Sequence, residues 1–216
     1  MFVEKWMTPD PATLPPDTTI SRVALEMSRR KFRHFPIVEP SRNGKRLVGI
    51  VAKYDIARGF PSNLNPFSVE VHEDSVPRSV SSVMSTRVIT TTPHCPVEEA
   101  AKLLRSHRIG ALPVLRENRM VGIITESDVF EALINVTAAK SGGTRIMIAS
   151  DSRTSPVPEI IKLSRRYRLD LMSILSFHEN RLRDQDLSIF RFGSRLPAEF
   201  LQNVAEHGFR VITAGP

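Results

Sequence analysis

Apolar residues recur with a helical period in two segments of the first half of the chain. In each segment they stand at i, i+3, i+4 and i+7, which is the spacing of one apolar helix face. The two sets are Ile20, Val23, Ala24 and Met27, and Val97, Ala100, Ala101 and Leu104. We therefore expect two amphipathic helices, the first capped by Asp17 or Thr18 and the second opened by Pro96.

Each of these helices is followed by two short apolar runs of the kind that form buried strands. The runs are residues 35–38 and 46–51 after the first helix, and 112–115 and 119–124 after the second. A further helix is expected to begin at Asp55 and at Asp128. The pattern thus predicts the same succession of elements twice.

A shift of 77 residues aligns residues 6–38 with residues 83–115 without a gap. It pairs Met7 with Met84, Thr13 with Thr90, and Pro36 with Pro113. The first copy then has four extra residues in a turn, so Gly49 corresponds to Gly122. Each copy is predicted to run strand, helix, strand, strand, helix. Such a unit cannot bury both faces of its sheet, so we expect the two to pack back to back around a shared core.

Residues 140–145, "KSGGTR", interrupt the pattern and predict a domain boundary. The rest of the chain predicts strands at 145–150, 171–177, 187–192 and 209–214, with helices at 158–167 and 197–207. This βαββαβ order is that of a ferredoxin-like domain. The fold class expected is therefore α/β (α+β), with a tandem pair of βαββα units and a C-terminal βαββαβ domain.

Composition places the chain among globular proteins. It has 216 residues, of which 41% are hydrophobic, and no apolar run long enough to cross a bilayer. The charged, proline-rich start is not a signal peptide. A single cysteine excludes an internal disulfide and fits a reducing compartment. We expect a cytoplasmic protein with no membrane partner.

The net charge of +7 and the sequence pI of about 10.1 allow an alternative function, binding of nucleic acid by a basic protein. Arg and Lys are spread along the chain, however, whereas nucleic-acid binders concentrate their charge on one face or element. A solvated basic surface is the favoured interpretation.

Motifs for catalysis and for metal binding are not found. The six histidines show no metal-ligand spacing, and the chain has no GxGxxG, Walker, HExxH or GxSxG motif. We expect no catalytic residues, no metal, no covalent cofactor and no enzymatic activity.

The order of short motifs in each copy resembles a cystathionine-β-synthase (CBS) domain, and the tandem copies resemble a CBS pair, or Bateman module. The motifs are "VMSTRVITT", "LPV" and "VGIITESD" in the second copy, with weaker counterparts in the first. The resemblance implies CBS repeats at residues 1–60 and 81–140, joined by a connector at 61–80. It also implies a homodimer and a regulatory adenosine-containing ligand in the clefts between repeats, namely AMP, ADP, ATP or S-adenosylmethionine.

Residues 144–216 resemble an ACT domain, a regulatory module that often binds amino acids. The loop at 150–159 lacks the glycine usual there, so pairing of edge strands into a dimer is favoured over amino-acid binding. A CBS pair followed by an ACT-like domain resembles the acetoin-utilisation accessory proteins of bacteria.

Thr125 and Asp128 are the leading candidates for ligand contact. A carboxylate can accept hydrogen bonds from both ribose hydroxyls, and a threonine hydroxyl can donate to a phosphate near a helix N-terminus. The resemblance assigns these same roles. The alternative is that "TESD" is an ordinary helix cap.

The first copy departs from this motif because Ala52 replaces the threonine. Asp55 remains for a ribose, and Lys53 offers a charge to a phosphate. Capping alone is an equal alternative here, so we expect one good site and one weak, altered or empty site.

An adenine ring needs a flat apolar slot, and the second copy offers one. Its expected residues are Val88, Ile89, Thr90, Ile109, Gly110, Ala111 and Pro113, where the small side chains allow close approach to the backbone. Arg33 and His34, at the equivalent place in the first copy, are candidates for phosphate contact, and the equal alternative is that they are polar residues facing solvent. The expected function is a non-catalytic sensor that passes its signal to the C-terminal domain or to a partner.

Overall fold

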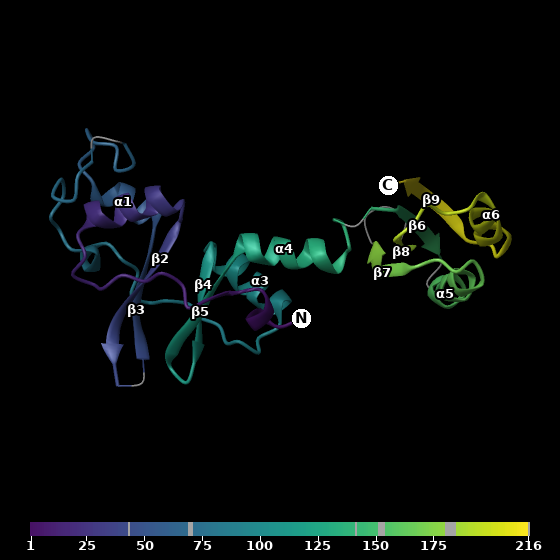
Figure 1. The fold of residues 1–216 in the computed structure, drawn as a ribbon, viewed down its shortest axis with the longest axis horizontal. Helices are drawn as coiled ribbons and strands as arrows, with labels where there is room; N and C mark the ends of the chain where they lie inside the picture. Colours follow the sequence, from purple (N-terminus) through teal and green to yellow (C-terminus); the bar gives the residue numbers. More distant parts are fainter. Residues whose placement is uncertain (43, 69–70, 141, 151–153, 180–184, 216) are drawn as a thin grey trace. The chain divides into compact units, whose positions relative to one another are not determined.

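The two amphipathic segments form helices α1 (Ile20–Arg30) and α3 (Val97–His107) (Figure 1). The structure is a computed structural model that describes the chain apart from residues 43, 69–70, 141, 151–153, 180–184 and 216. Thr19, rather than Asp17 or Thr18, caps α1, because its Oγ1 accepts the N–H of Arg22 at 3.2 Å. Both helices end at a left-handed residue, Lys31 (φ 57°) and Arg108 (φ 54°).

The strands after each helix pair with each other in antiparallel fashion, as the apolar runs predict. Strand β2 (His34–Ser41) pairs with β3 (Gly44–Ala52), and β4 (Ala111–Arg116) pairs with β5 (Arg119–Thr125). Helices α2 (Lys53–Gly59) and α4 (Glu126–Val136) follow directly. They begin two residues before Asp55 and Asp128, so these aspartates are the third helical residue rather than the first.

The expected first strand of each repeat is reduced to short pairings, and these pairings reach the other repeat. Strand β1 (Thr8–Pro9) pairs with β5, while Ser85 forms a bridge to Ile50 of β3. The N-terminal segment is rich in proline, which has no N–H to donate to a sheet. A long strand is therefore not formed there.

Two short 3-10 helices each place an apolar side chain in the core of the other repeat. Val3 of η1 (Val3–Lys5) is fully buried in the core of the second repeat. Val80 of η2 (Val80–Ser82) is fully buried in the core of the first. Each repeat thus completes the apolar interior of the other.

Each repeat has its own core, and a third cluster lies between the two sheets. The first core contains Phe35 and Ile37 with the buried face of α1, and the second contains Leu112 and Ile124 with the buried face of α3. The third consists of Val38, Ala111, Met120 and Ile123. The predicted packing of the two repeats around a shared core is confirmed by this third cluster.

Two glycines allow methionines to rest on the strands. A Cβ added to Gly49 would lie 2.5 Å from the Sδ of Met84, and one added to Gly122 would overlap the Sδ of Met7. At Gly122 the backbone oxygen of Thr8 is also only 3.1 Å away. At these two positions the start of one repeat crosses β3 or β5 of the other repeat.

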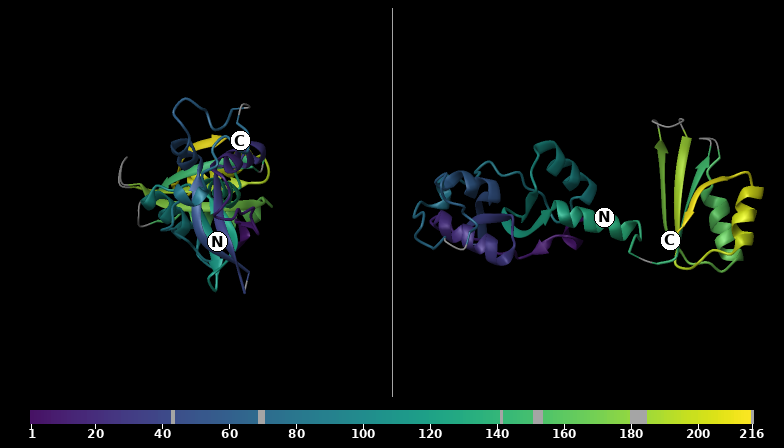
Figure 2. Two further views of the ribbon diagram at one scale, coloured as in Figure 1. Left: turned by 90° about the vertical axis from the view of Figure 1, so that its left-hand side faces the viewer. Right: turned by 90° about the horizontal axis from the view of Figure 1, so that it is seen from above.

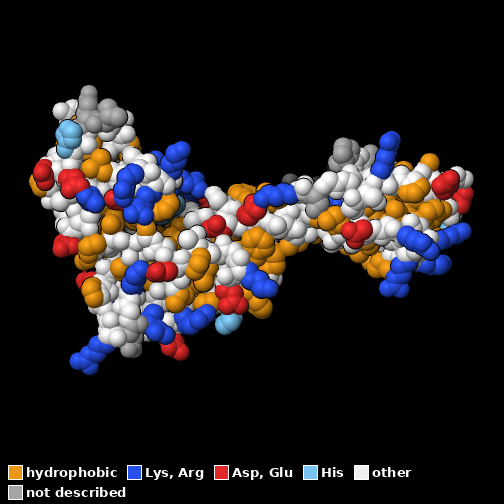
Figure 3. Space-filling view, viewed as in Figure 1, with side chains coloured by type: hydrophobic (Ala, Val, Ile, Leu, Met, Phe, Trp, Pro, Cys, Tyr) orange, Lys and Arg blue, Asp and Glu red, His pale blue; other side chains and the backbone are white. Residues whose placement is uncertain are grey.

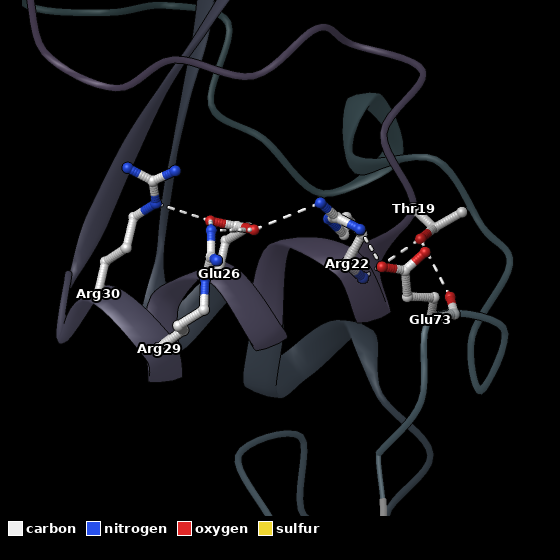
Figure 4. Close-up of polar contacts among 6 residues, drawn as sticks. All are labelled: Thr19, Arg22, Glu26, Arg29, Arg30 and Glu73. Atoms are coloured by element: carbon white, nitrogen blue, oxygen red, sulfur yellow. Dashed lines mark hydrogen bonds and ion pairs between the residues drawn. The ribbon is translucent and has the colours of Figure 1, made fainter.

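A group of charged residues lies along α1 (Figure 4). Glu26 is only 7% exposed, and guanidinium groups of Arg22, Arg29 and Arg30 surround its carboxylate at 2.7 to 3.4 Å. The hydrogen bond from Arg30 is the largest cause that lowers the pKa of Glu26 below its ordinary value. The carboxylate is covered by arginine side chains rather than by apolar core.

Residues Met1–Phe130 form one compact unit and Glu131–Pro216 a second, with the division inside α4. The second unit contains β6 (Thr144–Ser150), α5 (Val157–Arg166), β7 (Leu171–Glu179), β8 (Gln185–Phe192), α6 (Ala198–Glu206) and β9 (Arg210–Gly215). All six elements expected here from the sequence are present. The sheet is antiparallel in the order β7-β8-β6-β9, and α5 and α6 cover one of its faces (Figure 2). Its core is formed by Ile146, Ile148, Phe190, Phe192 and Phe200 with the inner faces of the helices.

Candidate functional site

Two hollows lie within the first unit, and each is lined by both repeats. Hollow 1 has a volume of about 290 Å³ and is lined by Thr8, 11–12, 31–34 and Pro36 from the first repeat and by Ile123, Thr125 and Ser127 from the second. Hollow 2 has a volume of about 340 Å³ and is lined by Ser85, 87–89 and 108–111 from the second repeat and by His34, Ile50, Ala52, Tyr54 and Asp55 from the first. Both volumes are close to the lower limit for small-molecule sites.

The hollows follow the repeat symmetry, which corrects the expected grouping of the site residues. Val88, Ile109, Gly110 and Ala111 line hollow 2 together with Asp55, not with Thr125. Thr125 instead lines hollow 1 together with Arg33 and His34. The physical reason is the packing of the two repeats against each other, which brings the strand-to-helix turn of one repeat to the slot of the other.

Four of the expected residues lie outside both hollows, namely Thr90, Pro113, Lys53 and Asp128. Pro113 is buried in β4, opposite Ile123, and Thr90 is half-buried just before Thr91. Lys53 does not offer its charge to hollow 2, because its Nζ lies 4.7 Å from the centre of the Phe67 ring. Phe67 belongs to the connector, so this contact follows from long-range packing that the motif alone does not contain.

Thr125 and Asp128 form the helix cap that was the alternative to ligand binding. Oδ2 of Asp128 accepts the backbone N–H and the hydroxyl of Thr125, both at 2.7 Å. Thr125 Oγ1 in turn accepts the N–H of Asp128 at 3.4 Å. The half-buried carboxylate of Asp128 is not among the groups that line hollow 1.

Asp55 makes half of the same arrangement. Its Oδ2 accepts the N–H of Ala52 at 2.9 Å, but Ala52 has no hydroxyl to complete the box. Its Oδ1 lies 3.9 Å from the guanidinium of Arg58. Asp55 does line hollow 2, so the weaker of the two motifs presents its carboxylate to a hollow.

The charges around the two hollows differ. The described lining of hollow 1 contains Lys31, Arg33 and His34 and no carboxylate, and Arg33 donates from Nη2 to the Ser127 hydroxyl at 3.2 Å. Hollow 2 contains Arg87 and Arg108 as well as Asp55. Hollow 1 therefore suits an anion, and hollow 2 suits a ligand with both hydroxyl groups and negative charge.

Several lining residues were not identified from the sequence, among them the polar side chains of Lys31, Tyr54, Arg87, Arg108 and Ser127. The repeat alignment could have identified two of them. Lys31 and Arg108 are basic residues at equivalent repeat positions, directly after α1 and α3. Their left-handed conformation places them at the turn from each helix into the next strand.

His34 lies between the two hollows and lines both. Burial lowers its pKa below the ordinary value of 6.5, and the nearby charge of Arg33 lowers it further. The carboxylates of Glu126 and Asp55 act in the opposite direction. The ring is consequently neutral at neutral pH.

Other kinds of site find little support in the described part of the chain. Its His, Cys, Asp and Glu side chains form no group of three or more that could hold a metal ion. Helices long and apolar enough to cross a membrane are likewise absent from the described residues. On the face shown in Figure 3, Lys and Arg side chains are dispersed, with acidic side chains among them, and do not form a continuous track.

Comparison with known proteins agrees with this architecture. The family model for the CBS domain matches residues 3–62 and 80–135. A CBS domain-containing protein of Dictyostelium discoideum is 32% identical over 141 residues, covering 63% of this chain and 93% of that protein.

Two solved structures extend the similarity. AcuB of Vibrio cholerae, a protein named for acetoin utilization, is 30% identical with a TM-score of 0.54, covering 65% of this chain and 95% of that one. The CBS domain pair of protein MJ0100, in complex with 5'-methylthioadenosine and S-adenosyl-L-methionine, is 25% identical with a TM-score of 0.51, covering 62% and 95%. The two matched segments coincide with the two repeats that exchange their N-terminal segments. The chain therefore belongs to the CBS-domain family and carries two CBS domains in tandem.

Proposed function

We propose that this protein is a non-catalytic regulatory protein whose CBS pair binds an adenosine-containing ligand in hollow 2. The observation that carries the proposal is the composition of that hollow. Val88, Ile89 and Ile109 provide an apolar wall next to the small residues Gly110 and Ala111. Asp55 faces them from the other repeat as the acceptor for ribose hydroxyls.

The basic side chains of hollow 2 extend the proposal to phosphorylated ligands. Arg87 and Arg108 can pair with the phosphates of AMP, ADP or ATP. Tyr54, which is 70% exposed, can stack on a base or pack against a ligand tail. S-adenosylmethionine stays in the set because the similar CBS pair of MJ0100 was solved with it and with methylthioadenosine.

The second unit is proposed to be a ferredoxin-like, ACT-like domain that receives the signal. Numbered along the chain, its strands lie in the order 4-1-3-2 (β9-β6-β8-β7), which supports the proposal.

Edge strand β7 carries the partly exposed apolar side chains Ile174, Leu175 and Phe177, which favours a homodimer formed there. The single cysteine fits a reducing compartment, and a cytoplasmic role is part of the proposal. Similarity to AcuB suggests a function related to acetoin utilisation.

Calorimetry with AMP, ADP, ATP and S-adenosylmethionine tests the ligand and the site together. Asp55→Ala should weaken the best ligand about tenfold to a hundredfold, the effect of losing hydrogen bonds to a charged group. The result that contradicts the proposal is either no binding of any of the four ligands or unchanged affinity in Asp55→Ala.

Asp128→Ala is the matched control. Both substitutions remove a carboxylate from the third position of a helix and one or more capping hydrogen bonds. Only Asp55 lines a hollow, so Asp128→Ala should lower stability without a comparable loss of affinity. A larger loss of affinity in Asp128→Ala than in Asp55→Ala would contradict the assignment of the ligand to hollow 2.

A further inference from the structure

His34 carries an imidazole at a position where its counterpart in the second repeat has only a methyl group. It is the first residue of β2, and pairing with Ala52 of β3 fixes its backbone. The equivalent residue in the second repeat is Ala111, whose side chain ends at Cβ. The repeat symmetry of the two hollows is therefore broken at this position, where only the first repeat carries an imidazole.

Gly110 makes room for that imidazole. A Cβ added to Gly110 would lie 2.8 Å from Cε1 and 3.1 Å from Nε2 of His34, so the ring rests directly on the glycine backbone. Gly110 belongs to the slot of hollow 2, whereas its own repeat counterpart, Arg33, belongs to hollow 1. One ring from the first repeat thus forms part of the wall of both hollows.

The charges that act on His34 come from both sides of this wall. Arg33 adjoins it in hollow 1 and lowers its proton affinity, as burial also does. Asp55 in hollow 2 and Glu126 at the start of α4 raise it. An anion that pairs with Arg33 would remove one of the two lowering influences. A ligand that engages Asp55 would alter one of the two raising influences.

We propose that His34 couples the two hollows, so that the occupancy or charge of hollow 1 sets ligand affinity in hollow 2 through the position and protonation of this ring. Coupling of this kind is reciprocal, so a ligand in hollow 2 changes the affinity of hollow 1 for an anion by the same factor. The inference rests on the proposed function for the identity of the ligand. The influence of groups in both hollows on His34 can be tested without any ligand.

The first test is an NMR titration of the full-length protein with ¹³C-labelled histidine, in which His34→Gln assigns the His34 resonance. Arg33→Gln should raise the pKa of His34, and Asp55→Asn should lower it. Lys31→Gln is the matched control, since it removes the other cation of hollow 1, and it should change this pKa less than Arg33→Gln does, because Arg33 directly precedes His34. A His34 pKa that is the same in Arg33→Gln and Asp55→Asn as in the wild type overturns the proposal.

The second test is a double-mutant cycle measured by calorimetry with AMP. Arg33→Gln should change the dissociation constant of AMP at least about fivefold in the wild-type background and not at all in the His34→Gln background. The same change in both backgrounds, or none in either, overturns the coupling. If the wild type binds neither AMP nor S-adenosylmethionine, the proposed function fails, and the NMR titration alone decides whether His34 senses both hollows.

Discussion

Thr91 carries a hydroxyl group that the fold does not use. The residue is 6% exposed, and its Oγ1 is buried without a hydrogen-bond partner among the residues that the structure describes. Its backbone is fully engaged: the N–H donates to the Pro113 carbonyl at 3.0 Å, and the carbonyl accepts from Leu115 at 2.8 Å. Replacing the hydroxyl with a methyl group in Thr91→Val should therefore stabilise the protein.

The first repeat shows that this position accepts an apolar side chain. Leu14, the counterpart of Thr91, makes the same parallel bridge to its neighbouring strand. An unsatisfied buried hydroxyl costs about 1–3 kcal/mol, and a buried methyl contributes about 0.8 kcal/mol. The protein already tolerates the hydroxyl, so we expect Thr91→Val to raise the free energy of unfolding by about 1–2 kcal/mol.

Urea unfolding followed by the fluorescence of Trp6 measures this change. Trp6 is the single tryptophan, and it packs against the same core cluster that contains Val114, the bridge partner of Thr91. Thr91→Ser keeps the hydroxyl but removes the methyl, so it should lower the free energy of unfolding by about 1 kcal/mol. Thr90→Val, at the half-buried neighbour, should stay within about 0.5 kcal/mol of the wild type. A Thr91→Val protein that is no more stable than the wild type would show that the hydroxyl has a partner and would refute the reasoning.

Two further predictions concern stability. Glu26→Gln should lower the free energy of unfolding by about 1–3 kcal/mol, because three guanidinium groups lose a charged acceptor. The pKa of Glu26 is lowered by folding, so this stabilisation should be complete above the ordinary pKa of 4.5 and disappear as the pH falls through the lowered pKa. Urea titrations of both proteins between pH 3 and pH 7 check the sign, and a difference that grows in acid would contradict it. Gly49→Ala and Gly122→Ala should both destabilise, but Met84→Ala should rescue the first better than Met7→Ala rescues the second, since only Gly122 also faces a backbone oxygen. Thermal unfolding of the single and double variants decides this, and equal rescue at both glycines would count against it.

The helices and the paired strands could be predicted from the sequence because their signals are local. The i, i+3, i+4, i+7 spacing that begins at Ile20 and at Val97 gave both amphipathic helices, and the short apolar runs gave β2 to β5. The first strand of each repeat was overestimated, since the prolines around Thr8 limit its pairing. Local patterns also left the cap of α1 undecided between Asp17 and Thr18, where the structure uses Thr19.

The composition of each hollow depended on information that a repeat alignment does not contain. The alignment identifies Asp55 with Asp128, and Ala111 with His34, but it does not say whether a hollow is built from one repeat or from two. The packing of the repeats decides that, and it places Asp55, not Asp128, opposite the apolar slot. In the same way, the contact of Lys53 with Phe67 comes from the connector.

The burial of Val3 and Val80 in each other's repeat has a practical consequence for anyone who shortens this chain. A fragment that ends with the first repeat would retain Val3 but lack the core in which Val3 is buried. It would also lack Val80, which fills the core of the first repeat. Neither repeat therefore has a complete core by itself. Two copies of one repeat could complete their cores only by exchanging their N-terminal segments. The smallest piece that keeps both interiors closed runs from η1 into α4, because Val129 of α4 packs against the core of the second repeat.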